Sequence, residues 1–410
     1  MTQVDLTERA AQLMVSHVEQ ATQQESLKPL VEGVRQLLTE MGVSIGRIQI
    51  PMTKLGALRH PTYWGIMLTW NSDSAFEETF LVTHEQRAQQ DLPSSLADIH
   101  VGSLAENLPK HSPYFDLLQS GQDALRINLA EDNLRHEILK TLRANGMVDY
   151  LALALPIPGV PLPQLMSVAA TAPFPDDFEA QISRIKNILA LSLFGACQAS
   201  QSMALAKTYL GRKTGPRVLS GDIARGSSQE IEAGIMFCDI RGFTALSEHL
   251  GGSGMLPVMN ALFEVIGEAA TAQGGEILKF IGDAMLIVFR RDTRSDAEIA
   301  SAMIDATDAA TRGVQIVAES HALPLDAGFG CHIGKVLYGN IGTPDRLDFT
   351  VMGPAVNLTS RLEGLTKCVD SKAVFSQAVA KHVDTLTHAG DFEVKGITAP
   401  VALYIKPTNA

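Results

Sequence analysis

Cysteine is scarce in this chain of 410 residues, which has only four: Cys197, Cys238, Cys331 and Cys368. They lie far apart and form no CxxC pair. This spacing argues against a structural zinc site and against a disulfide framework. We therefore expect free thiols and a reducing compartment.

An excess of positive charge is also missing. Lys and Arg together number 33 against 45 Asp and Glu, so the formal net charge is −12. A broad surface for nucleic acid or for an anionic membrane is therefore excluded, whereas a local basic pocket for a phosphate ligand is not. We expect no nucleic-acid partner.

Long hydrophobic runs are absent as well. The longest apolar stretch, around Ile188–Cys197, has about half the length that a bilayer requires. The N-terminal segment MTQVDLTERAAQLM carries acidic residues and lacks the basic-then-apolar pattern of a signal peptide. These features predict a cytoplasmic protein with no membrane partner.

What is present is an ordinary globular composition, with 46% hydrophobic and 19% charged residues. The length favours two domains and a connector. We place a first domain at 1–175, a helix and linker at 176–228, and a second domain at 229–410. In the first domain the residue patterns predict helices and strands, among them a helix at Leu27–Met41 and strands at Tyr63–Trp70, Glu78–Val82, Tyr150–Leu155 and Leu165–Ala170.

The connector, 176–210, has the pattern of one long helix. Ile182, Leu189, Ala196 and Met203 recur every seven residues, which favours two parallel helices packed against each other in a dimer. Ser192 and the alanines are poor residues for such a seam, so the alternative is an amphipathic helix packed on its own domain.

In the second domain, strands and helices alternate with antiparallel returns. We predict a strand at Ile231–Cys238, a hairpin at Glu276–Phe289, a helix at Asp296–His321 and a strand pair within Asp326–Gly342. This order indicates an α+β fold with helices on a sheet.

Two aspartates in this domain suggest phosphate chemistry. Asp239 ends an apolar strand just before a helix start at Gly242–Thr244, where unpaired N–H groups can bind phosphate. Asp283 follows Gly282 in a hairpin turn. Each alone could be a cap or a turn residue. Together, close in space, they would repel each other without a cation between them, as in a two-metal phosphoryl-transfer site.

Four segments in order resemble the class III nucleotidyl cyclases: FCDIRGFT, GGEILKFIGDAMLIVF, HIGKVLYGNIG and RLDFTVMGPAVNLTSRLE. The resemblance covers about residues 230–405. It implies a ferredoxin-like catalytic domain that converts ATP to 3′,5′-cyclic AMP and pyrophosphate with two Mg²⁺ or Mn²⁺ ions per site.

The resemblance also implies roles for individual residues. Asp239, Asp283 and the Ile240 carbonyl would hold the metal ions. Asn357 and Arg361 would orient the ribose and stabilise the transition state. The implied substrate contacts are the purine-reading pair Lys279 and Thr350, and the phosphate contacts Phe243, Thr244, Lys395 and Arg346.

Physical reasons support several of these roles. Asn357 and Arg361 lie four apart and so share one helix face, and a guanidinium suits the charge on a pentavalent phosphate. A lysine at 279 can donate to adenine N1, whereas guanine carries a hydrogen there. Guanylyl cyclases of this family place Glu and Cys at the two purine-reading positions, so Lys279 and Thr350 favour ATP over GTP.

In this family the metal aspartates come from one protomer and the purine-reading and Asn/Arg residues from the other. One domain here holds both sets, which implies a homodimer with two sites. Two alternatives stay open: a catalytically inactive cyclase-like module that binds nucleotide or dimerises, and a guanylate cyclase. Intact Asp239, Asp283, Lys279, Asn357 and Arg361 argue against the first.

The first domain more loosely resembles a GAF-like sensor through Ser112–Asn128, the Tyr150–Pro156 strand and the sequence PFPDDFEAQISR before the long helix. A PAS-like or unclassified sensor is the rival interpretation. A small-molecule ligand there could alter the helices and move the cyclase protomers. We interpret the histidines as surface residues rather than haem or metal ligands (His60, His84, His100, His111 and His136), and His332 as a packed core histidine.

Overall fold

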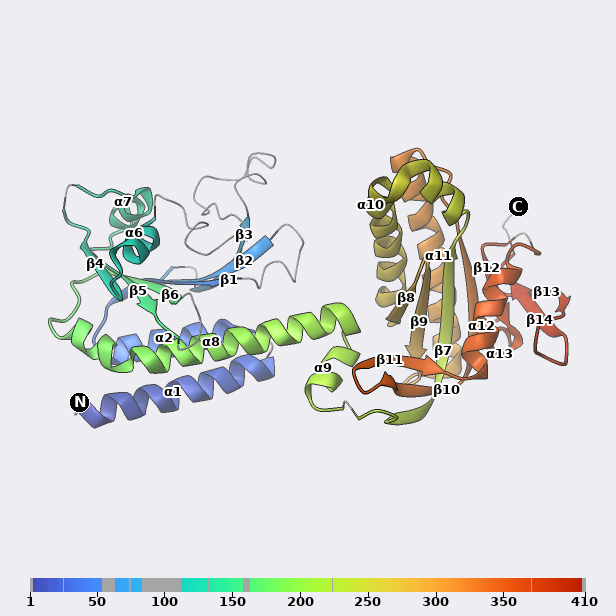
Figure 1. Cartoon of the computed structure of the whole chain (residues 1–410), viewed down its shortest axis with the longest axis horizontal. Helices are drawn as coiled ribbons and strands as arrows, with labels where there is room; N and C mark the ends of the chain where they lie inside the picture. Colours follow the sequence, from blue (N-terminus) through green and yellow to red (C-terminus); the bar gives the residue numbers. More distant parts are fainter. Residues whose placement is uncertain are drawn as a thin grey trace. The chain divides into compact units, whose positions relative to one another are not determined.

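The computed structural model describes residues 3–24, 26–53, 63–73, 75–82, 112–131, 133–157, 163–222, 224–369 and 371–407. The chain divides into two compact units, Met1–Leu205 and Ala206–Ala410. Figure 1 shows the elements of each unit.

The first unit is built on a six-stranded antiparallel sheet in the order β3-β2-β1-β6-β5-β4. Its strands are β1 (Ile45–Thr53), β2 (Tyr63–Asn71), β3 (Ala75–Val82), β4 (Ala124–Asn128), β5 (Asp149–Leu155) and β6 (Gln164–Ala170). The strands predicted around 63–82, 150–155 and 165–170 are therefore present.

Helices cover both faces of this sheet (Figure 1). On one face lie α1 (Gln3–Gln24), α2 (Lys28–Glu40) and the long α8 (Phe178–Leu210). Their apolar side chains form one core with alternate strand residues such as Ile48 and Leu151. On the other face, α6 (Pro113–Ser120) and α7 (Glu137–Ala144) pack over Tyr150 in a second core.

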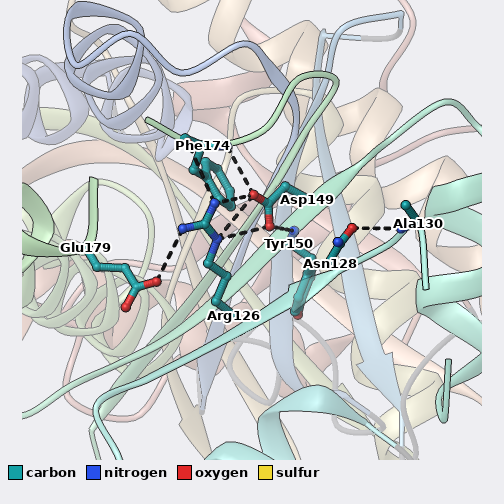
Figure 2. A network of polar contacts seen from close by, with 7 residues as sticks. All are labelled: Arg126, Asn128, Ala130, Asp149, Tyr150, Phe174 and Glu179. Carbon is teal, nitrogen blue, oxygen red and sulfur yellow. Dashed lines mark hydrogen bonds and ion pairs between the residues drawn. The ribbon is translucent and has the colours of Figure 1, made fainter. Parts of the chain in front are cut away.

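A partly buried ion pair connects the start of α8 to the edge of this sheet (Figure 2). Arg126 Nη2 of β4 donates to Asp149 Oδ2 of β5 at 2.7 Å, and the same carboxylate accepts the Phe174 N–H at 3.0 Å. Arg126 Nη1 also reaches Glu179 in the first turn of α8 at 3.5 Å. The largely buried Asp149 is thus hydrogen-bonded on both oxygens, as a buried charge requires.

The interpretation of the seven-residue row as a dimer seam is wrong. Ile182, Leu189 and Ala196 are buried in the core of their own unit, whereas Met203, the fourth residue of the row, is half-buried and lies outside that core. The alternative, an amphipathic helix packed on its own domain, holds because the sheet offers this stripe a continuous apolar surface. In contrast to this buried row, Leu191 of α8 is exposed to solvent.

Among the described residues, α8 alone is long and apolar enough, by length and composition, to cross a membrane. The core helix of a soluble protein passes the same test. Several of its apolar residues are used in the core of the first unit.

The second unit contains an eight-stranded sheet in the order β13-β14-β12-β10-β7-β9-β8, with β11 paired to β10. The strands are β7 (Ser228–Ile240), β8 (Glu276–Ile281), β9 (Ala284–Arg290), β10 (Ala327–Thr343), β11 (Arg346–Met352), β12 (Ala373–Ser376), β13 (Thr387–Phe392) and β14 (Val401–Ile405). The predicted hairpin is present as β8 and β9. The predicted strand pair within Asp326–Gly342 is wrong, because β10 is one long strand that pairs with β7 from Ala327 to Gly339.

The helices of this unit lie on opposite faces of the sheet. On one face are α10 (Phe243–Ala272, interrupted at Gly251) and α11 (Asp296–His321, as predicted). On the other, α12 (Pro354–Leu365) packs against β10, where Gly330 would place a side chain within 2.4 Å of the α12 backbone. The short α9 (Thr214–Leu219) and α13 (Gln377–Ala380) complete the unit.

Candidate functional site

Asp239 and Asp283 come together at one end of the sheet, as predicted. Asp239 lies next to the end of β7 and pairs with Ala284, the first residue of β9. Asp283 precedes Ala284 in the two-residue turn with Gly282, whose φ of 64° suits glycine. Burial and the negative charge of Asp283 raise the pKa of Asp239. This mutual repulsion is the electrostatic condition for a cation site.

The first turn of α10 lies beside these carboxylates in the chain. Ile240 is the last residue of β7, and Phe243 and Thr244 open the helix. No side chain caps this helix start and its first turn has no acidic residue. Its N–H groups are therefore available to phosphate oxygens at the positive end of the helix dipole.

Lys279 lies in β8, next to a β-bulge between Ile277 and Lys279. Its ammonium group donates to Asp348 of β11. Thr350, two residues further along β11, is only 7% exposed. The strands thus bring the predicted purine-reading residues to neighbouring positions, but sequence reasoning missed Asp348, because nothing in the local pattern pairs it with a lysine 69 positions away.

Asn357 and Arg361 are both exposed, one turn apart on α12. Arg361 lies near the loop that carries Lys395, since its guanidinium is 3.9 Å from where Gly396 would place a side chain. Lys395 itself is exposed, as is Arg346 at the start of β11. The described contacts include no hydrogen bond or ion pair from either Asn357 or Arg361 to the two aspartates.

The donors present fit divalent ions that prefer oxygen. Within the described residues, no group of three or more His, Cys, Asp or Glu could hold a metal ion. Mg²⁺, however, is typically bound by one or two carboxylates together with substrate phosphates and waters. Asp239, Asp283 and the Ile240 carbonyl could supply the protein oxygens of such a site. The uncapped N-terminus of α10 could bind the substrate phosphates.

Glu363 is a third carboxylate near this site that sequence reasoning missed. It lies on the buried face of α12, is 8% exposed, and its Oε1 is 2.5 Å from where Gly328 would place a side chain. Gly328 pairs directly with Asp239. Burial first, and then the charge of Asp239, raise the pKa of Glu363 to about 7. The only feature of the sequence that could have pointed to Glu363 is its position two residues after Arg361.

We expect Glu363→Gln to flatten the pH dependence of stability. A raised carboxyl pKa means that the folded state binds the proton more tightly, so the wild type loses stability as pH rises from about 4.5 to about 7. Glutamine cannot titrate. Allowing for solvent screening, the wild type should lose on the order of 1–2 kcal/mol more than the variant between pH 5 and 8. Thermal melts of both proteins with EDTA measure this, and parallel pH profiles would contradict it.

Other sequence predictions have mixed outcomes. All four cysteines are free, as expected. His332 is packed, its Nδ1 lies 2.8 Å from the Ser376 hydroxyl, and burial lowers its pKa to about 4, as expected for a core histidine. The surface interpretation of His136 is wrong, because it is 2% exposed and bonded to Asp116 at 2.7 Å. His60, His84, His100 and His111 lie outside the described residues.

Comparison with known proteins identifies the class of this unit. Residues 227–406 match the family model of the adenylate and guanylate cyclase catalytic domain. The segment contains every predicted site residue, from Asp239 to Lys395. The second unit is therefore similar to adenylate and guanylate cyclase catalytic domains, and the match does not extend to the first unit.

Two curated relatives are adenylate cyclases. The chain is 33% identical over 165 residues to the adenylate cyclase of Anabaena cylindrica, covering 40% of this chain and 33% of the relative. It is 30% identical over 183 residues to adenylate cyclase 1 of Rhizobium meliloti (strain 1021), covering 43% and 27%. The chain thus matches about a third or less of these relatives' length.

Solved structures of both types are similar to a part of the chain. The adenylyl cyclase CyaB from P. aeruginosa is 27% identical with a TM-score of 0.42, covering 45% of this chain and 97% of that one. The guanylyl cyclase Cya2 is 27% identical with a TM-score of 0.38, covering 43% and 92%.

Proposed function

We propose that this protein is an adenylate cyclase that converts ATP to 3′,5′-cyclic AMP and pyrophosphate. The observation that carries the proposal is the pair Asp239 and Asp283, which lie together beside the uncapped start of α10 within the cyclase catalytic domain. This arrangement suits a triphosphate bound through divalent ions.

The proposed roles follow from the positions of the side chains. Asp239, Asp283 and the Ile240 carbonyl hold two Mg²⁺ or Mn²⁺ ions, while the α10 N–H groups at Phe243 and Thr244 bind the phosphates. When bound, the ions lower the pKa of the ribose 3′-hydroxyl and neutralise the leaving pyrophosphate. Asn357 and Arg361 orient the ribose and stabilise charge on the α-phosphate, with Lys395 and Arg346 contributing further phosphate contacts.

The preference for ATP over GTP rests on Lys279 and Thr350. An ammonium donor suits the acceptor N1 of adenine and would face the N1–H donor of guanine. A buried polar group left without a partner discriminates strongly against the wrong ligand. The Lys279–Asp348 contact supports this role, since the carboxylate limits the motion of the ammonium group.

A homodimer of catalytic domains is the proposed active form. Support comes from Asn357 and Arg361, whose exposed side chains have no described contact with the aspartates. Exposed apolar residues on the strands near Lys279 and Thr350 also favour a protein–protein interface there. They are Phe280, Ile281, Leu337, Ile341 and Leu347. A two-fold axis would bury these strands and unite the metal-binding half of one protomer with the Asn/Arg half of the other.

The first unit is proposed to be a GAF-like sensor that responds to a small molecule and regulates the cyclase. Its link to the catalytic unit through α8 supports this, because the Arg126–Asp149 network fastens that helix to the sensor sheet. Deleting residues 1–200 should then change activity or abolish a response. Unchanged activity and responses would reject the regulatory role.

Product analysis tests the function itself. The purified full-length protein is incubated with ATP or GTP and with Mg²⁺ or Mn²⁺, and the products are separated by chromatography. We expect cyclic AMP as the main product. Cyclic GMP as the main product would favour guanylate cyclase. Bound nucleotide without any cyclic product, under every metal condition, would favour an inactive nucleotide-binding module.

A further inference from the structure

The segment that enters the catalytic unit is fastened to the sheet by a buried polar cluster. Glu276 at the start of β8 is 6% exposed, and both of its carboxylate oxygens are bonded. Thr214 of α9 donates to Oε1 at 3.1 Å, and the hydroxyl of Tyr338 in β10 donates to Oε2 at 3.2 Å. Thr214 is itself fully buried. Such a cluster holds its members firmly, because any one left unpaired would be costly.

Aromatic contacts extend this cluster to β11. The guanidinium of Arg217, also in α9, lies 5.4 Å from the ring centre of Tyr338 and 5.2 Å from that of Phe349. The two rings pack edge to face at 4.7 Å. Arg217 is oriented by Asp222, which its Nε reaches at 3.1 Å. The first turns of the catalytic unit therefore contact β8, β10 and β11 together.

These contacts lie next to the residues proposed to read the purine. Glu276 is three residues before Lys279 in β8, and Phe349 immediately precedes Thr350 in β11. The end of α8 also lies against β8, since Gly211 would place a side chain 3.4 Å from the Ile277 carbonyl oxygen. A shift of α9 cannot occur without a change at one of these strands.

We propose that Thr214, Arg217, Glu276 and Tyr338, here called the linker clasp, are positioning residues that align Lys279 and Thr350 for ATP. The inference rests on the proposed function for its kinetic consequence. Through the linker clasp, the segment that follows α8 sets the positions of β8 and β11, which carry Lys279 and Thr350. This effect is separate from any change in the dimer interface.

The test compares Thr214→Val and Tyr338→Phe with a matched control, Thr307→Val, in the full-length protein. Thr307 is an equally buried threonine of α11 whose hydroxyl bonds within its own helix at 2.8 Å. Hydrogen exchange of peptides spanning 276–283 and 346–352 is measured first. We expect faster exchange there in both clasp variants, and no change in the control even where its melting temperature falls.

Kinetics then separate positioning from stability. In the clasp variants, KM for ATP should rise by about 3- to 10-fold, the loss expected from one hydrogen bond, and the preference for ATP over GTP should narrow. The Thr307→Val control should keep the wild-type KM for ATP and the wild-type preference for ATP over GTP. Unchanged exchange in the two peptides, or equal changes in the control, would overturn the proposal. A wild type without cyclase activity would reject the proposed function, while hydrogen exchange would still decide the clasp.

Discussion

Asp239→Asn and Arg361→Ala should each nearly abolish cyclic AMP formation, and mixing the two should restore it. The first change removes a charged metal ligand and the second a cation at the reacting phosphate, so each should lower kcat by about 10²–10³-fold or more. If two protomers share each site, a heterodimer of the variants has one site with both defects and one that is intact. An equal, freely exchanging mixture should therefore regain about a quarter of wild-type activity.

The matched control is a mixture of Asp239→Asn with Asp283→Asn. Both changes affect the metal-binding half, so every site in that heterodimer is defective and activity should stay absent. Two different affinity tags allow each heterodimer to be purified before the assay. An inactive Asp239→Asn/Arg361→Ala heterodimer, from variants that fold and dimerise normally, would contradict a shared site. So would full activity in a monomeric wild type.

Lys279→Met should lower kcat/KM for ATP by about 10²–10³-fold, because the adenine N1 acceptor loses its donor in a partly enclosed site. Restoring some activity with GTP requires an acceptor at this position. Lys279→Glu alone would place two carboxylates together, since Lys279 contacts Asp348. We therefore expect the triple change Lys279→Glu, Asp348→Asn, Thr350→Cys to raise the GTP-to-ATP ratio of kcat/KM above that of the wild type.

A suitable control is Lys406→Met, which removes a lysine paired with a carboxylate, Asp308, that has no place in the proposed site. Its kinetics with both nucleotides should match the wild type. Steady-state assays with ATP and GTP measure all these variants. If Lys279→Met lowered activity with both nucleotides by the same factor, the lysine would serve folding or general binding rather than purine choice.

Local patterns were enough to predict much of the second unit. The strand that delivers Asp239, the hairpin with Gly282-Asp283 and the helix Asp296–His321 were predicted from apolar runs and turn residues, which act over a few positions. In the structure, that helix begins with a capping box formed by Ser295 and Glu298. Four motifs in this unit resemble the class III cyclases, and the match to the family model of the cyclase catalytic domain supports that resemblance.

The row Ile182, Leu189 and Ala196 shows where local patterns are ambiguous. A stripe at seven-residue spacing is apolar whether it faces a second helix or a sheet, and only the tertiary structure shows that it faces the sheet. The same holds for β10. It was predicted as a pair of strands but is one strand, in which Gly328 and Gly330 make room for α12.

The sequence by itself thus determined which residues the proposed site contains: the two aspartates, the lysine and threonine proposed to read the purine, and the Asn/Arg pair one helical turn apart. Only the tertiary structure showed what surrounds them. Asp348 beside Lys279, Glu363 across Gly328 from Asp239, and Thr214 bonded to Glu276 are contacts between residues 35 to 124 positions apart in the chain. Such contacts depend on strand order, register and helix placement, which no local pattern encodes.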